Sequence, residues 1–478
     1  MTTVKKNFFF NGLLLLSNLV FPVINFAYAS RVLGPAGIGK VQFVVVFATY
    51  FVVIAQFGIP VYGMREIAKA KNNREKQDEI FSELLLINLL SSLLLTVIYG
   101  TIIFSVGRFH NSINYYLLGG LLVLSGFSVL DWYYKGKEQF RFLSLRSVVI
   151  KLIALTALFL WVRTPNDLMV YFLITLFSIL ATNIWNLLHL KGQITIRFKQ
   201  IHPRRHWRAL FILYASSLTI SVYTLGDTIL LGFLTNNKAV GFYTAAKKLI
   251  IVTIPLVTSL GTVLIPRLAQ SLDMQDKKET DTRIGQSFSF ICLFGIPASM
   301  GIYVFAPEIM RVFSGVQFAP AALTLRLIAP VIFLVGLGHL FGMQLLIPGG
   351  FEKQYLQATL LGTGISLVLN LVLIQQFQDK GAAATLLITE AAVSWTAYFF
   401  VVKKMNIYVH WSLAGKAFVA SLLFFPVAWF LRKGIIPLTG GLWLALFLSA
   451  ILYLLVQQFV FKETLLRSLF SSFLKRFV

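Results

Sequence analysis

The stretch KKNFFFNGLLLLSNLVFPVINFAYASR, residues 5–31, shows the pattern that the rest of the chain repeats. Two lysines precede an apolar run, residues 8–29, and a single arginine follows it. A helix rises 1.5 Å per residue, so this run is long enough to cross roughly 30 Å of hydrocarbon. The cationic flanks suit the two headgroup regions of a bilayer. We therefore predict a transmembrane helix here.

The same stretch also resembles a cleavable signal peptide, with basic residues at its start and the small-residue pattern Ala27-Tyr28-Ala29 near its end. Its apolar run is longer than the roughly 7–15 residues usual in signal peptides. It also contains several asparagines and Pro22, which suit a kinked helix facing other helices. We expect it to be retained as the first span.

Apolar runs of similar length recur along all 478 residues. We predict about fourteen transmembrane helices, near residues 8–29, 40–62, 80–106, 113–131, 147–163, 167–190, 209–234, 239–265, 284–305, 320–346, 355–377, 381–402, 413–431 and 440–461. Hydrophobic residues make up 57% of the chain, which suits this number of spans and leaves little sequence for a soluble domain. The predicted fold class is an all-α polytopic membrane protein.

Lysine and arginine test this count, because cytoplasmic loops of membrane proteins are enriched in them. With the amino terminus in the cytoplasm, most of the 42 Lys and Arg residues fall in cytoplasmic loops. The predicted outer connections contain only Arg31, Arg108, Arg163, Lys238, Arg311, Lys380, Arg432 and Lys433. One missed helix would invert every later loop and destroy this asymmetry. We therefore expect an even number of helices and two cytoplasmic termini.

The net charge of +24 follows from the same loops. Cations confined to short cytoplasmic loops suit anionic lipid headgroups, so we expect membrane lipid and no nucleic acid as a partner. The single cysteine, Cys292, lies in an apolar run, and an intrachain disulfide is excluded.

Two parts of the chain resemble each other at a constant offset of 202 residues. Gly39 aligns with Gly241, and Arg65 aligns with Arg267. Each glycine opens the second span of a six-span half, and each arginine closes that span before a charged loop. Because six spans separate the copies, the halves should be related by a pseudo-two-fold axis along the membrane normal. We predict an N-terminal lobe (1–208), a C-terminal lobe (209–404), and two additional helices with a cytoplasmic tail (405–478).

Short outer connections argue against a membrane enzyme that would hold acidic catalytic groups in a large outer loop. The sequence also shows no Gly-Lys-Ser/Thr phosphate loop, His-rich metal cluster or Ser-His-Asp arrangement at one membrane face. We expect no enzymatic activity, no cofactor and no metal. His339 lies well within a span and is expected to be a hydrogen-bonded core residue.

Ionisable residues within spans are the best functional pointers, because they normally face protein or a water-filled cavity. Ser216, Thr219, Tyr223 and Asp227 are spaced by three and four residues, which places them on one helix face. Lys247 and Lys248 lie at a depth similar to that of Asp227 on the next span. An ion pair is expected, but one acid cannot readily satisfy two lysines about 100° apart around a helix. The alternative is that Asp227 only neutralises one lysine.

Three further ionisable residues lie within or at the end of predicted spans. Arg326 lies about six residues into the tenth span, and Arg31 lies at the outer end of the first. Both would add positive charge to the outer part of a cavity, or else extend to the interface. Glu390 lies near the middle of the twelfth span with Ser394 one turn on, where it could exchange protons or simply hydrogen-bond another helix.

Four short motifs resemble the polysaccharide flippases of the multidrug/oligosaccharidyl-lipid/polysaccharide (MOP) exporter superfamily over essentially the full length. They are Arg31-Val32-Leu33-Gly34-Pro35 followed by Gly37-Ile38-Gly39, Phe57-Gly58-Ile59-Pro60 leading to Arg65-Glu66, Val240-Gly241-Phe242-Tyr243-Thr244-Ala245-Ala246-Lys247-Lys248-Leu249, and Ala306-Pro307-Glu308-Ile309-Met310-Arg311-Val312-Phe313-Ser314-Gly315.

The resemblance implies two six-helix lobes in a V shape and alternating access. It also implies outward movement of an undecaprenyl-pyrophosphate-linked oligosaccharide across a bacterial inner membrane for O-antigen, lipopolysaccharide or exopolysaccharide synthesis. The residues carried over to a cationic cavity are Arg31, Asp227, Lys247, Lys248 and Arg311, whereas Arg326 and Glu390 are inferred from their position in spans. A proton or sodium ion and a polysaccharide polymerase are candidate partners. The alternatives are an exporter of organic cations, which would need a more acidic cavity, and an enzyme of envelope glycan assembly.

Overall fold

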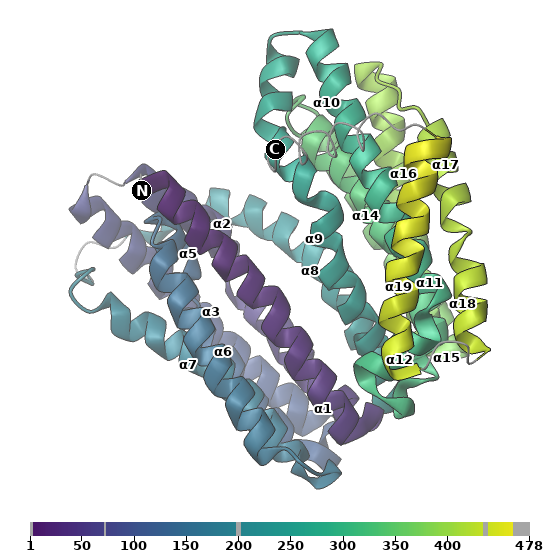
Figure 1. The fold of residues 1–478 in the computed structure, drawn as a ribbon. Coiled ribbons are helices and arrows are strands. Elements are labelled where there is room, and N and C mark those ends of the chain that lie inside the picture. Colours follow the sequence, from purple (N-terminus) through teal and green to yellow (C-terminus); the bar gives the residue numbers. More distant parts are fainter. Residues whose placement is uncertain (1–2, 71–72, 197–201, 434–437, 462–478) are drawn as a thin grey trace. The chain divides into compact units, whose positions relative to one another are not determined.

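The computed structural model describes residues 3–70, 73–196, 202–433 and 438–461 (Figure 1). Within these ranges the chain is helical and contains no strand. It divides into two compact units, Met1–Gly241 (unit 1) and Phe242–Val478 (unit 2). The predicted cytoplasmic tail, from residue 462 onward, lies outside the described residues. The lobe boundary at residues 208 and 209 stays a prediction.

Unit 1 contains α1 (Thr3–Ala55), α2 (Ile59–Lys69), α3 (Arg74–Ser105), η1 (Gly107–Ser112), α4 (Ile113–Leu124), η2 (Ser125–Ser128), α5 (Asp131–Gly136), α6 (Phe140–Trp161), η3 (Pro165–Asp167), α7 (Leu168–Leu190), η4 (Pro203–His206) and α8 (Trp207–Leu234). Helix α9 (Asn237–Asp273) begins in unit 1 and continues in unit 2.

The rest of unit 2 comprises α10 (Lys277–Phe290), η5 (Ile291–Gly295), α11 (Ile296–Val304), α12 (Ala306–Ser314), η6 (Val316–Phe318), α13 (Ala321–Ile328), α14 (Val331–Gly338), η7 (His339–Leu346), α15 (Glu352–Phe377), α16 (Asp379–Met405), α17 (Ser412–Ser421), α18 (Phe424–Arg432), α19 (Leu438–Leu455) and η8 (Val456–Val460).

Twelve helical segments of the described chain are long and apolar enough to cross a membrane. One of them, Phe9–Ala55, is twice the usual length and is broken at Gly34, whose φ of 69° and ψ of 175° are not helical. Only glycine adopts this conformation without large strain, and Pro35 then begins the second arm. The arms, residues 9–33 and 35–55, are about 37 and 31 Å long, so α1 counts as two crossings. With the 28-residue α8 added, the helices agree with the predicted number of spans.

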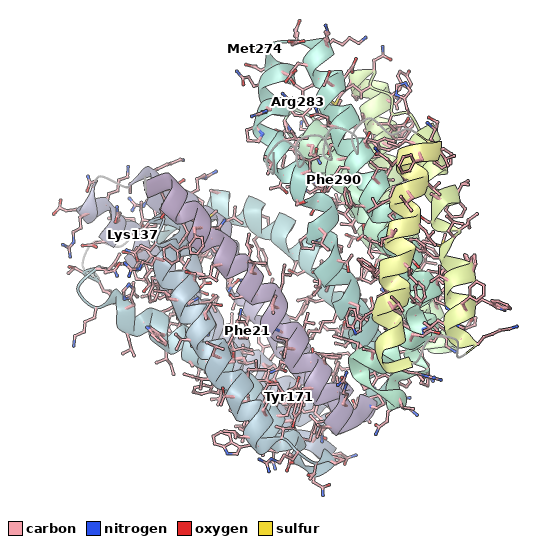
Figure 2. All side chains as sticks on the ribbon, viewed as in Figure 1. Phe21, Lys137, Tyr171, Met274, Arg283 and Phe290 are labelled. Carbon is pink, nitrogen blue, oxygen red and sulfur yellow. The ribbon has the colours of Figure 1, made fainter. Side chains whose placement is uncertain are left out.

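Helices of unit 1 expose large apolar side chains over successive turns. On α3, Leu90, Leu94 and Val97 have exposed fractions of 58%, 61% and 67%. Such a surface would favour aggregation in water but suits a lipid environment. Figure 2 shows Phe21 and Tyr171 along the helices of this unit, whereas Lys137 lies at one end of them. The distribution confirms a multi-pass membrane protein.

The second arm of α1 crosses the start of α9 at two glycines. A Cβ atom added to Gly39 would lie 1.6 Å from the carbonyl oxygen of Asn237, and one added to Gly241 would lie 2.0 Å from that of Pro35. The two contacts are equivalent under the repeat. Gly39 and Gly241 are 202 residues apart, and so are the residues that they meet, Pro35 and Asn237. This equivalence supports the predicted internal repeat, since a two-fold axis between the glycines would generate this arrangement.

In unit 2, α16 packs against α13, α14 and α15. The last helices pack on the same unit: α17 and α18 lie against α11, and α19 lies against α18. An ion pair fixes α18, because Arg432 Nε donates to Glu308 Oε1 on α12 at 2.8 Å. Arg432 also donates to the carbonyl of Val304 at 2.7 Å. Helices α17 to α19 are therefore held on unit 2 by packing and by the ion pair of Arg432 with Glu308.

Candidate functional site

Two of the predicted site residues lie in unit 1. Arg31 is exposed near the end of the first arm of α1, three residues before the break at Gly34. Asp227 on α8 is buried, with an exposed fraction of 3%, and its Oδ1 accepts hydrogen bonds from the backbone N–H and hydroxyl of Thr228. The side chains of Ser216 and Tyr223, predicted on the same face, lie outside the described residues. Lys247 and Lys248 belong to unit 2, so the ion pair expected with Asp227 stays a prediction.

The other predicted cations lie on three helices of unit 2. Lys247 and Lys248 are half-buried on α9, and the Lys247 ammonium lies 5.3 Å from the ring centroid of Tyr243. Arg326 on α13 is half-buried, and its Nε donates to the carbonyl of Tyr303 at 3.2 Å. Arg311 is exposed in the last turn of α12. The ring of Tyr243 and the carbonyl of Tyr303 therefore help to orient Lys247 and Arg326, respectively.

Glu390 lies half-buried on α16. Within the described part of the chain, its carboxyl group makes no hydrogen bond and no ion pair. Ser394, one turn on, does not bond to it, because its hydroxyl donates to the carbonyl of Leu334 at 2.8 Å. The carboxyl group is therefore available to a ligand or an ion. His339, by contrast, is hydrogen-bonded through Nδ1 to Gln344 at 3.0 Å, as expected of a core residue.

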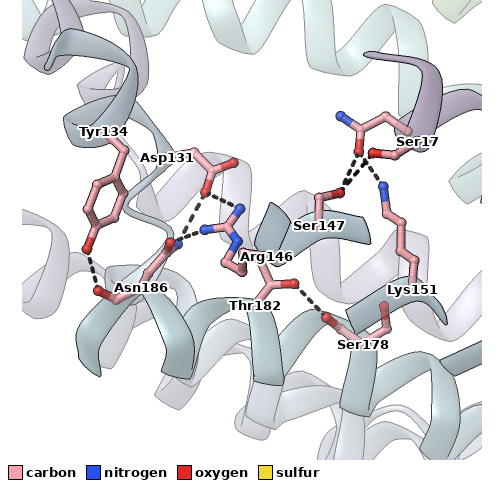
Figure 3. Close-up of polar contacts among 10 residues, drawn as sticks. Ser17, Asp131, Tyr134, Arg146, Ser147, Lys151, Ser178, Thr182 and Asn186 are labelled. Carbon is pink, nitrogen blue, oxygen red and sulfur yellow. Dashed lines mark hydrogen bonds and ion pairs between the residues drawn. The ribbon is translucent and has the colours of Figure 1, made fainter. Parts of the chain in front are cut away.

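Unit 1 contains a buried polar network that was not predicted from the sequence (Figure 3). Arg146 on α6 is 3% exposed, and its Nη2 donates to Asp131 Oδ1 at 3.1 Å. Asn186 on α7 donates to the same oxygen at 3.2 Å and accepts a bond from Arg146 Nη1. The sequence placed Arg146 one residue outside a span, in a cytoplasmic loop. The structure corrects the loop placement, because Arg146 is a paired cation inside α6, whereas its cytoplasmic side stays a prediction.

Lys151 is the second missed cation, and it lies on the same helix (Figure 3). Its ammonium donates to Oδ1 of Asn18 on α1, which is an uncharged partner. Its position within a predicted span was the available signal. The pairing itself could not be read from the sequence, because Lys151 and Asn18 are 133 residues apart.

A third polar network joins the segment that precedes α8 to other helices of unit 1. Glu83 is fully buried and accepts bonds from Arg205 Nη2 at 2.7 Å and from His206 Nε2 at 2.6 Å. Tyr62 on α2 is hydrogen-bonded to the other ring nitrogen of His206 at 2.7 Å. Burial alone would lower the pKa of Arg205, but its bonds to Glu83 and Glu79 raise the pKa above the ordinary value. These contacts fasten η4 to α2 and α3.

Each unit also has an apolar groove on its own helices. The groove of unit 1 has a volume of about 710 Å³ and lies between α4 and α7, with Leu121, Phe177 and Trp185 in its wall. The groove of unit 2, of about 670 Å³, lies between α11, α14 and α17. Such surfaces suit hydrocarbon chains. The described residues contain no group of three or more His, Cys, Asp or Glu side chains that could hold a metal ion.

Comparison with solved structures identifies the fold. The chain is similar to the lipid II flippase MurJ in an inward closed conformation, with a TM-score of 0.77 and 13% identity over 95% of this chain and all of that one. It is also similar to an inward-facing multidrug resistance MATE family transporter of the MOP superfamily, with a TM-score of 0.65 and 14% identity over 81% of this chain and 94% of that one. The fold is that of the MOP exporters.

Residues 4–272 match the family described as "Polysaccharide biosynthesis protein". The chain belongs to this family, which confirms the resemblance to the polysaccharide flippases of the MOP superfamily. A relative named putative O-antigen transporter, from Escherichia coli K12, is 24% identical over 84% of this chain and 97% of its own length. A relative named probable low-salt glycan biosynthesis flippase Agl15, from Haloferax volcanii, is 25% identical over 45% of this chain and 46% of its own length. These relatives confirm a transporter rather than an enzyme.

Proposed function

We propose that the protein is a flippase that moves undecaprenyl-pyrophosphate-linked oligosaccharide from the cytoplasmic to the outer leaflet of a bacterial inner membrane. The observation that carries the proposal is a set of cations within spans, Lys247, Lys248 and Arg326, on a MOP fold whose family is named for polysaccharide biosynthesis. The named O-antigen transporters and glycan flippase support the same substrate class.

The chemistry of such a substrate fits these residues. A pyrophosphate with about two negative charges and hydrophilic sugars cannot enter hydrocarbon unaided, whereas a polyprenyl chain can remain in the lipid. Lysine and arginine would bind the phosphates, with Arg31 and Arg311 nearer the outer ends of their helices. Alternating access of two lobes would then carry the headgroup across the membrane while Asp227 or Glu390 binds a proton or sodium ion. A polysaccharide polymerase would consume the product.

The proposal is tested by deleting the gene and analysing lipid-linked oligosaccharides. We expect an undecaprenyl-pyrophosphate oligosaccharide to accumulate on the cytoplasmic leaflet while surface polysaccharide is lost, and the wild-type gene to restore both. Unchanged polysaccharide together with increased sensitivity to cationic drugs would instead show a multidrug exporter.

Charge reversal tests the cations themselves. We expect Lys248→Glu and Arg326→Glu proteins to reach normal membrane levels but to reduce surface polysaccharide at least tenfold, because each removes a charged hydrogen bond of about 1.5–3 kcal/mol and adds repulsion. Lys248→Arg and Arg326→Lys should retain partial activity. Lys353→Glu, at the exposed start of α15, is the matched control. Normal polysaccharide from abundant Lys248→Glu and Arg326→Glu proteins would show that these cations are structural.

A further inference from the structure

Lys151 lies in the middle of a membrane-spanning helix. It is eleven residues from the start of α6 and ten from its end, so its Cα lies about 15 Å from either end. A charged side chain at that depth normally faces protein or a water-filled cavity, because transfer to hydrocarbon is unfavourable. The question is which group balances this charge.

The described part of the chain supplies no such group. The ammonium of Lys151 donates to the amide oxygen of Asn18, and no carboxylate of the described residues lies within ion-pair distance of it. The acid on the neighbouring helix, Asp131, is already bonded to Arg146 and Asn186. Asp131 is therefore the ion-pair partner of Arg146, and it acts on Lys151 only from a longer distance. The ammonium has three N–H donors, and Asn18 takes one of them.

Lys151 adjoins a row of amides on the first arm of α1. Asn11, Asn18 and Asn25 are seven residues apart, so they follow one helix face with a drift of only about 20° per step. Asn18 is exposed and also accepts a 3.4 Å bond from the hydroxyl of Ser147. The amides of Asn11 and Asn25 make no hydrogen bond within the described part of the chain. We call these three asparagines the amide row.

The opposite face of the same arm is apolar. Leu16 and Val20, each two residues from Asn18 and thus about 200° away around the helix, are 60% and 48% exposed. Hydrocarbon suits these side chains, whereas it would leave an exposed amide and an ammonium without partners. The amide row therefore marks a face of unit 1 that contacts water or a polar ligand over about 21 Å of the arm.

We propose that the amide row and Lys151 form a binding track for the headgroup of the substrate: the amides hydrogen-bond sugar hydroxyls, and Lys151 binds an anionic group of the same molecule. This inference rests on the proposed function and adds a site on unit 1 to the cations of unit 2. The anionic group is a phosphate or a carboxylate, so it belongs either to the carrier's pyrophosphate or to an acidic sugar.

The first experiment measures binding to the purified full-length protein, with inorganic pyrophosphate and sodium glucuronate as probes. We expect Lys151→Gln to weaken one probe about tenfold, which corresponds to the loss of one charge-assisted hydrogen bond, and Lys151→Arg to stay near the wild type. A weakened pyrophosphate interaction assigns the site to the carrier, and a weakened glucuronate interaction assigns it to an acidic sugar. Unchanged binding of both probes would overturn the role of Lys151.

The second experiment uses the gene-deletion strain. Asn11→Leu and Asn25→Leu remove no hydrogen bond within the described chain, so we expect normal protein levels and a several-fold loss of surface polysaccharide. Leu16→Ala, on the apolar face, is the control that should retain full activity. Normal polysaccharide from abundant Asn11→Leu, Asn25→Leu and Lys151→Gln proteins would overturn the track but leave the proposed function intact. A deletion strain that accumulates no lipid-linked oligosaccharide would overturn the proposed function instead.

Discussion

At the scale of single residues, Glu390 offers the most direct test of ion coupling. We predict that Glu390→Gln keeps the shape of the side chain and normal membrane levels but lowers transport at least tenfold, because a glutamine cannot change charge as access alternates. Transport of a fluorescent or radiolabelled lipid-linked oligosaccharide into vesicles, with and without ionophores, measures this. Glu352→Gln, in the exposed first turn of α15, is the control. Unchanged transport by the Glu390→Gln protein would contradict this prediction. If the Asp227→Asn protein also kept its transport and its response to ionophores, ion coupling by either acid would be refuted.

Embedded charges could be predicted from the sequence, but their partners could not. Glu390, Arg326 and the lysine pair of α9 could be found from the sequence, because a charge inside an apolar run is visible without knowing its neighbours. The pairing of Arg146 with Asp131 could not, because it depends on how α5, α6 and α7 pack. Whether an embedded cation is structural or functional is decided by such partners: Arg146 has a carboxylate, whereas Lys151 has only an amide.

At the scale of helices, the crossing of α1 and α9 gives a sharp prediction. We expect Gly39→Ala and Gly241→Ala to lower membrane levels and thermal stability strongly, by more than the roughly 1–3 kcal/mol of ordinary overpacking, because the new methyl group would meet a backbone carbonyl that cannot move alone. Gly100→Ala on α3 is the matched control, since no atom lies within 4 Å of its added Cβ. It should be neutral or slightly stabilising, because alanine favours helix. Melting in detergent and quantitative blotting measure the difference.

Equal stability of the Gly39→Ala and Gly100→Ala proteins would show that the crossing is looser than the structure indicates. The alignment of Gly39 with Gly241 was visible in the sequence, but the reason for it was not. The 202-residue spacing of the two glycines predicts a repeat. The fold adds the reason for glycine, because the backbone of α9 lies against Gly39 and the backbone of α1 lies against Gly241.

At the scale of the whole molecule, long apolar runs made the helices predictable, because a helix that crosses hydrocarbon must satisfy its backbone internally over about 20 residues. The break in α1 was harder to foresee from periodicity alone. Gly34 and Pro35 mark it in the sequence, yet helical backbone continues on both sides of a single residue with positive φ. The attachment of α18 through Arg432 and Glu308 depends on residues 124 apart and was not predicted.

The topology is the last prediction, and α9 makes it testable. This helix runs from Asn237 to Asp273 over 37 residues, or about 55 Å, which exceeds the thickness of a bilayer, so its ends should lie on opposite sides. Lys277, Lys278 and Arg283 follow it, which places that end in the cytoplasm by the positive-inside rule. We therefore expect reporter fusions at Lys277 and at both termini to report the cytoplasm, and a fusion at Lys238 to report the outer side. The same sidedness at Lys238 and Lys277 would refute both the span count and the orientation. Reversed sidedness at every site would refute only the orientation, and with it the assignment of Arg31 and Arg311 to the outer ends of their helices.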